Sequence, residues 1–125
     1  MRLFLVLALL FIPEVVSAGT VYTPVTLTAT ATFTPQPGDA ITVVAVSVPA
    51  GGLSCYNINT PYLNLVGGTN GQIVIVVNVA TSGGCFYAPV INHQVFLRPT
   101  ANNVPALMAV RTENGWVGLN APAVP

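Results

Sequence analysis

Apolar and polar residues alternate most regularly between Val25 and Phe33. In this segment every second residue is apolar, and every residue between them is threonine. A period of two residues predicts a β-strand with one apolar and one polar face, and we place it within an N-terminal strand over residues 20–33. The apolar positions of this strand are Val25, Leu27, Ala29, Ala31 and Phe33.

Two other segments are apolar almost without interruption. They are Ala40–Val48 and Ile73–Ala80, both rich in Val and Ile. Short apolar runs between turn residues predict strands buried on both faces. A further alternating strand is predicted over Val90–Arg98, with His93 on its apolar face. Residues 55–66 are less regular, and they fit either two short strands or one kinked edge strand.

Glycine and asparagine mark the turns. Gly67–Gly71 predicts a hairpin-like turn, and Asn114-Gly115 predicts a two-residue hairpin between the strands Ala106–Glu113 and Trp116–Asn120. Turn residues recur about every eight to twelve positions, and no helical periodicity continues past residue 18. We therefore predict a single all-β domain over residues 19–125, an immunoglobulin-like β-sandwich of about seven strands.

Residues 1–18 have the pattern of a secretory signal peptide. Arg2 precedes an apolar run that ends at Pro13, and Val16 and Ala18 occupy the positions that precede a cleavage site. The alternative is a retained membrane anchor, but a span needs about 20 apolar residues and this run breaks earlier. We expect cleavage after Ala18, and a secreted or cell-surface protein without a stable membrane span.

The chain is almost uncharged. Charged residues make up 5% of it and hydrophobic residues 53%, which argues against disorder. So few charges cannot form the basic patch that nucleic-acid binding needs. Proteins that lack surface charge tend to associate, so we expect a homo-oligomer or a polymer.

Cys55 and Cys85 are the two cysteines of the chain. In an oxidising compartment an isolated pair more often forms a disulfide than a metal site, because zinc needs four ligands. We predict a disulfide between them, which would stabilise the fold by about 3 to 4 kcal/mol on the chain-entropy model. No metal or other cofactor is expected.

Candidate catalytic residues are few. His93 is the single histidine, and its predicted strand neighbours are apolar rather than nucleophilic or acidic. A pair of carboxylates beyond residue 18 would have to be Asp39 and Glu113, and each is more simply a turn residue. We do not expect an enzyme.

Aromatic side chains support an alternative function. Tyrosine rings and Trp116 can stack on sugar rings, with asparagines as hydrogen-bond partners, which would make the protein a secreted carbohydrate-binding or ligand-binding module. The residues concerned are Tyr22, Tyr56, Tyr62, Tyr87, Trp116, Asn57, Asn59 and Asn64. Such residues are also ordinary in the loops of β-sandwiches.

The N-terminal strand carries the leading hypothesis. It contains no charge, and it can complete either its own sheet or the sheet of a neighbour by strand addition. A signal peptide followed by such a strand and a charge-poor, Thr/Val-rich β-domain resembles secreted filament subunits of archaea and bacteria that polymerise by donor-strand exchange. The resemblance implies that Val25, Leu27, Ala29, Ala31 and Phe33 insert into the next subunit. We expect a structural subunit of an extracellular filament or cell-surface assembly.

Overall fold

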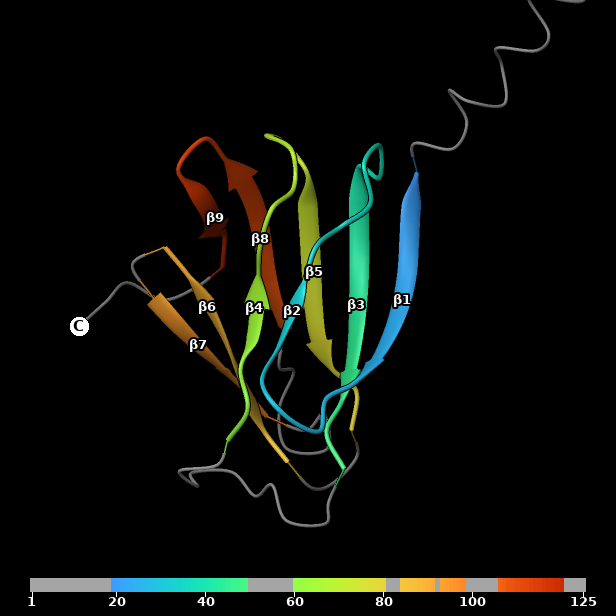
Figure 1. Ribbon diagram of the computed structural model, residues 1–125, viewed down its shortest axis with the longest axis vertical. Helices are drawn as coiled ribbons and strands as arrows, with labels where there is room; N and C mark the ends of the chain where they lie inside the picture. The colour runs from blue at the N-terminus through green and yellow to red at the C-terminus, as the bar shows by residue number, and fades with distance from the viewer. Residues whose placement is uncertain (1–18, 50–59, 81–83, 92, 99–105, 121–125) are drawn as a thin grey trace, which may run out of the picture.

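The computed structural model describes residues 19–49, 60–80, 84–91, 93–98 and 106–120. This part of the chain forms nine β-strands and no helix (Figure 1). The strands are β1 (Thr20–Thr26), β2 (Ala31–Phe33), β3 (Ile41–Ser47), β4 (Leu63–Leu65), β5 (Ile73–Asn78), β6 (Phe86–Val90), β7 (His93–Leu97), β8 (Ala106–Thr112) and β9 (Gly115–Gly118).

The strands lie in two layers. One layer is a five-stranded sheet in the order β1-β3-β5-β8-β9, in which β1, β3 and β5 are parallel and β8 and β9 are antiparallel to their neighbours. The other layer joins the parallel pair β2-β4 to the antiparallel pair β6-β7. A parallel bridge between Tyr62 and Tyr87 makes this connection. Figure 1 shows β2, β4, β6 and β7 in front of the larger sheet.

The hydrophobic core fills the space between the layers. The larger sheet contributes valines and leucine from alternate positions of β3, β5 and β8, and the smaller layer contributes side chains from β4, β6 and β7. Phe86, the largest fully buried side chain, is one of them. Alternation along each strand puts these residues on one face, so each strand turns a single face toward the core.

One buried amide connects the end of β5 to its surroundings. Asn78 is 0% exposed, and its Nδ2 donates hydrogen bonds to the carbonyl oxygens of Gly84 at 3.2 Å and Leu97 at 3.3 Å. Its Oδ1 accepts a hydrogen bond from the N–H of Ala80 at 3.1 Å. Burial of a polar side chain is tolerated here because its hydrogen bonds are made inside the protein.

The predicted all-β sandwich is confirmed, but an immunoglobulin-like topology is not. Immunoglobulin sheets are antiparallel, whereas β1-β3, β3-β5 and β2-β4 are parallel pairs. Parallel neighbours require chain crossings between the layers, and short alternating strands give no sign of strand direction.

Three predicted connections differ from the structure. Gly67–Gly71 does not close a hairpin, because it leads from β4 in one layer to β5 in the other. The predicted strand Val90–Arg98 is divided, since Val90 pairs with His93 across a tight turn. The final hairpin is shifted by one residue, because Thr112 pairs with Gly115 and the turn is Glu113-Asn114.

The two apolar runs form β3 and β5 as predicted, but they are not buried equally on both faces. The core-facing residues Val44, Val46, Val74 and Val76 are 0% exposed. The residues between them are mostly half-buried. The prediction is therefore correct for the inner face and wrong for the outer face.

Candidate functional site

The predicted N-terminal strand is divided between the two layers. β1 ends at Thr26 in the larger sheet, and β2 begins at Ala31 in the smaller layer. The expectation of one continuous strand over residues 20–33 is therefore wrong. Threonine and alanine alternate through the crossing as they do in a strand, so the pattern could not reveal where the chain leaves the sheet.

The five side chains predicted to insert into a neighbour have different surroundings. Leu27 is 1% exposed and belongs to the core, and Val25 and Phe33 pack against that core. Ala29 and Ala31 are exposed. If a strand of this chain inserts into a neighbour, the structure therefore indicates that the strand is β1 together with Leu27.

β1 covers the edge of β3, and no described strand pairs with the other edge of β1, which we call its open edge. The N–H of Leu27 donates a hydrogen bond to the carbonyl of Ser47 at 2.9 Å. Backbone groups alternate in direction along a strand, so the odd-numbered residues of β1 face β3 and the even-numbered residues face the open edge. Pro24, which has no N–H, therefore lies where no bond to β3 is lost.

A short connection joins β1 to the rest of the fold. Residues 28–30 are exposed, and the hydrogen-bonded structure resumes where the N–H of Ala31 donates to the carbonyl of Tyr62 at 2.9 Å. The N–H of Tyr62 in turn donates to Oγ1 of Thr30 at 3.1 Å. We call residues 28–30 the hinge.

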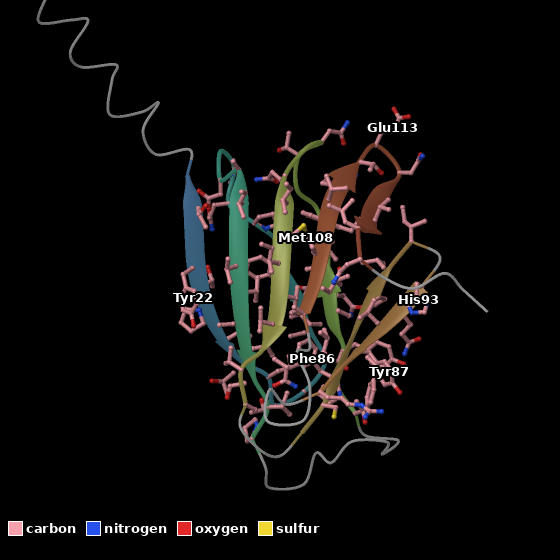
Figure 2. The ribbon with its side chains drawn as sticks, turned by 180° about the vertical axis from the view of Figure 1, so that it is seen from behind. Tyr22, Phe86, Tyr87, His93, Met108 and Glu113 are labelled. Atoms are coloured by element: carbon pink, nitrogen blue, oxygen red, sulfur yellow. The ribbon has the colours of Figure 1, made fainter. Side chains whose placement is uncertain are left out.

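The outer face of the five-stranded sheet is apolar. The strand register places Tyr22, Val43, Ile75 and Met108 in one row across β1, β3, β5 and β8. The rows on both sides of it are also mainly aliphatic. Figure 2 shows Tyr22 and Met108 on this face, which points away from the core. No described element covers it.

A second row of large side chains crosses the outer face of the smaller layer. The ring centroids of Tyr62 and Tyr87 are 5.2 Å apart, and those of Tyr87 and Phe96 are 4.8 Å apart. Gln94 donates from Nε2 to the hydroxyl of Tyr62 at 2.9 Å, and the guanidinium carbon of Arg98 lies 5.7 Å from the Phe96 centroid. We call Tyr62, Tyr87 and Phe96 the aromatic row.

The aromatic platform predicted from the sequence is assembled only in part. The structure brings Tyr62 and Tyr87 together, but Tyr22 lies on the outer face of the other sheet and Trp116 is 4% exposed within the core. Asn64 is half-buried on β4. Tyr56, Asn57 and Asn59 lie outside the described residues.

Sequence reasoning missed Phe96 as a member of the aromatic row and Gln94 as the hydrogen-bond partner of Tyr62 beside it. The sequence predicts both within one strand, Val90–Arg98, and such a strand gives no reason to place them beside Tyr87. The hairpin between β6 and β7 pairs Phe96 with Tyr87 and so completes the row. A turn signal at residues 91–92 would have indicated this pairing.

The ionisable residues weighed for catalysis occupy ordinary places. His93 begins β7 and is half-buried, Asp39 ends a turn in which its N–H donates to the carbonyl of Gln36 at 3.2 Å, and Glu113 lies in the β8-β9 turn. Figure 2 shows Glu113 and His93 at different places along the fold. Within the described ranges no group of three or more His, Cys, Asp or Glu residues is placed to hold a metal ion.

Cys85 is fully buried and lies immediately before β6. Cys55 and the predicted signal peptide, residues 1–18, lie outside the described residues. The disulfide and the export signal therefore remain predictions.

The part of the chain that the structure describes holds no helix long and apolar enough to cross a membrane. A search of family models, curated proteins and solved structures found no match to this chain.

Proposed function

We propose that the protein is a structural subunit of an extracellular filament or cell-surface assembly, and that subunits join by exchange of β1. One observation carries the proposal. β1 closes the edge of the larger sheet, yet its covalent connection to the rest of the described fold runs only through the exposed hinge. A strand with these two properties can be supplied by its own chain or by a neighbouring copy with the same contacts.

The edge of β3 needs a partner strand. β1 forms a seven-residue parallel ladder with β3, and β3 carries Val44 and Val46, which are 0% exposed. Removing β1 would leave the hydrogen-bonding groups of that edge unpaired and open the core beside it. The edge is therefore a strong acceptor for an identical strand.

Exchange is favoured over simple addition beyond β1. A strand added to the open edge of β1 would meet Pro24, which offers no N–H at the centre of that edge. β3 contains no proline. The short hinge also favours exchange. A connection of three residues gives β1 little freedom to fold back onto its own β3, so pairing with β3 of a neighbouring copy competes with it.

The length of the hinge provides the test. Inserting Gly-Ser-Gly between Ala29 and Thr30 gives β1 more freedom to fold back onto its own β3, so we expect large assemblies to be replaced by smaller species. Size-exclusion chromatography with light scattering, followed by electron microscopy, measures this change.

The matched control inserts the same three residues between Glu113 and Asn114, in a turn that has no role in exchange. Assemblies of this control should equal those of the unaltered chain. If the hinge insertion left the assemblies as large and as abundant as the control insertion did, exchange of β1 would be wrong.

The aromatic row supports a second candidate function, the binding of carbohydrate. Adjacent rings on a sheet face, with the Gln94 amide beside them, provide stacking surfaces and a hydrogen-bonding group. Tyr87→Ala removes the central ring and should abolish any signal on a glycan array, whereas Tyr22→Ala should not change it. An unaltered chain without any signal on the array would exclude this function for the glycans presented.

A further inference from the structure

The outer face of the five-stranded sheet is large for a face that no described element covers. Five strands spaced about 4.8 Å apart, each with about six residues that rise about 3.3 Å, give a face of about 500 Å². The largest apolar patch on a typical monomer covers about 300–600 Å² and often marks an interaction site. The face also carries Thr20, Thr26 and Ser47 near its two ends, so its apolar part is smaller than the whole and lies within that range.

Large side chains project from this face. Tyr22 is 66% exposed, Met108 is 38% exposed and Leu119 is 55% exposed. They belong to one row, because Tyr22 and Met108 align through the register of β1, β3, β5 and β8, and the N–H of Leu119 donates to the carbonyl of Met108 at 2.7 Å. The row extends from one edge of the sheet to the other.

None of the charged side chains that the structure describes lies on this face. Asp39 and Glu113 are turn residues. Arg98 lies beside Phe96 in the other layer. Arg111 faces inward beside the buried Trp116, and its Nε donates to the carbonyl of Gly67 at 2.7 Å. A partner would therefore have to be apolar and neutral on its own docking surface.

We propose that this face packs against the same face of a second copy of the chain. An identical face meets both requirements, because it is apolar and it brings no like charges together. Two such faces bury about 1,000 Å² in total, which reaches the lower limit for a specific interface. Two β-sheets pack face to face readily, with their strands about 30° apart.

The pairing adds a second interface to the proposed assembly. It rests on the proposed function, because both require that the chain associates with its own copies. Exchange of β1 joins subunits in a line when each chain gives its strand to the next copy rather than to the copy from which it receives one. Pairing through the sheet face stops at two copies, because the same face of each copy is then covered by the other. Together the two interfaces produce paired lines of subunits.

The test uses the full chain with the lengthened hinge, in which exchange is suppressed. We expect this chain to form a dimer in sedimentation velocity. Met108→Lys and Leu119→Lys each place a charge in the interface and should raise the dimer Kd about 100-fold or more. Thr32→Lys, on the outer face of β2, is the matched control and should leave the Kd unchanged. Circular dichroism of all variants should show the same β-sheet spectrum and a similar Tm.

Three results would overturn the pairing. The first is a lengthened-hinge chain that stays monomeric at every concentration tested. The second is a dimer as tight in Met108→Lys as in Thr32→Lys. The third is a monomer that floats with phosphatidylcholine vesicles, which would assign the face to lipid. If pairing holds and exchange fails, the chain with the original hinge also forms the dimer and nothing larger.

Discussion

Gly68 shows how closely the connection between the layers is packed. Its φ is +85°, which L side chains rarely adopt, and a Cβ built on it would lie 2.8 Å from Cζ2 of Trp116. Trp116 is buried, so it has little room to move. Glycine is therefore required here for two reasons, the backbone conformation and the approach of the indole ring.

We predict that Gly68→Ala destabilises the fold by about 3 kcal/mol, of which about 1 to 2 kcal/mol is backbone strain and the rest is the clash with Trp116. Gly38→Ala is the control, because Gly38 has a φ of +90° and no heavy atom within 4 Å of a built Cβ. Urea unfolding followed by tryptophan fluorescence measures both variants. Equal losses of stability would show that Trp116 does not restrict this position.

Gly68 also shows what sequence reasoning can provide at this scale. Gly67–Gly71 indicated a turn, and a turn is present. The sequence could not show that the turn leads into the other layer, or that Trp116 lies against it, because both facts depend on contacts between residues far apart in the chain. For the same reason the sequence predicts Trp116 as part of an aromatic platform, whereas the residue is buried.

At the scale of elements, strand positions were more predictable than strand partners. β3 and β5 follow from their apolar composition and β8 from the hairpin signal. The division of the first alternating segment did not follow, because exposed Ala29 and Ala31 keep the same alternation as buried Leu27. The aromatic row and the apolar outer face both depend on which residues lie side by side on neighbouring strands. The sequences of short strands do not specify this register, so both features are visible only in the folded structure.

Pro24 limits pairing at the open edge of β1. Its position on the open edge removes one donor from that edge without weakening the ladder with β3. We predict that Pro24→Thr keeps the fold at equal stability but increases sideways association, because a threonine N–H completes the row of donors at that edge. Turbidity and thioflavin fluorescence measure the association over time.

Thr26→Val is the control for Pro24→Thr, since it makes the same strand more apolar without changing its backbone donors. Association that rose equally in both variants would show that the added N–H at residue 24 is not the cause, and it would contradict the role assigned to Pro24.

At the scale of the whole molecule, the low charge content affects stability as well as association. The chain has three acidic residues in all. Acid denaturation arises mainly from the protonation of paired carboxylates, and this chain has few to protonate. The fold depends instead on apolar burial and backbone hydrogen bonds, which do not titrate.

We therefore predict that the free energy of unfolding changes by less than about 1 kcal/mol between pH 7 and pH 3. Urea denaturation of the hinge-lengthened chain at both pH values, at equal ionic strength, measures this difference. A loss of more than about 3 kcal/mol at pH 3 would mean that a carboxylate has a larger stabilising role than the structure indicates.

In the proposed assembly β1 of one subunit pairs with β3 of another, and a pair of introduced cysteines can trap this pairing. Thr26 and Ser47 are register partners on β1 and β3, and neighbouring strands are about 4.8 Å apart, within the range that a disulfide spans. The control pair, Ala45→Cys with Val77→Cys, joins β3 to β5 in the same parallel register.

Both double variants are assembled, oxidised and run on a denaturing gel without reductant. If β1 is exchanged, we expect a ladder of covalent multimers for Thr26→Cys with Ser47→Cys, and a single covalent monomer for the control pair. A covalent monomer for both pairs would show that each chain keeps its own β1, and it would contradict the exchange.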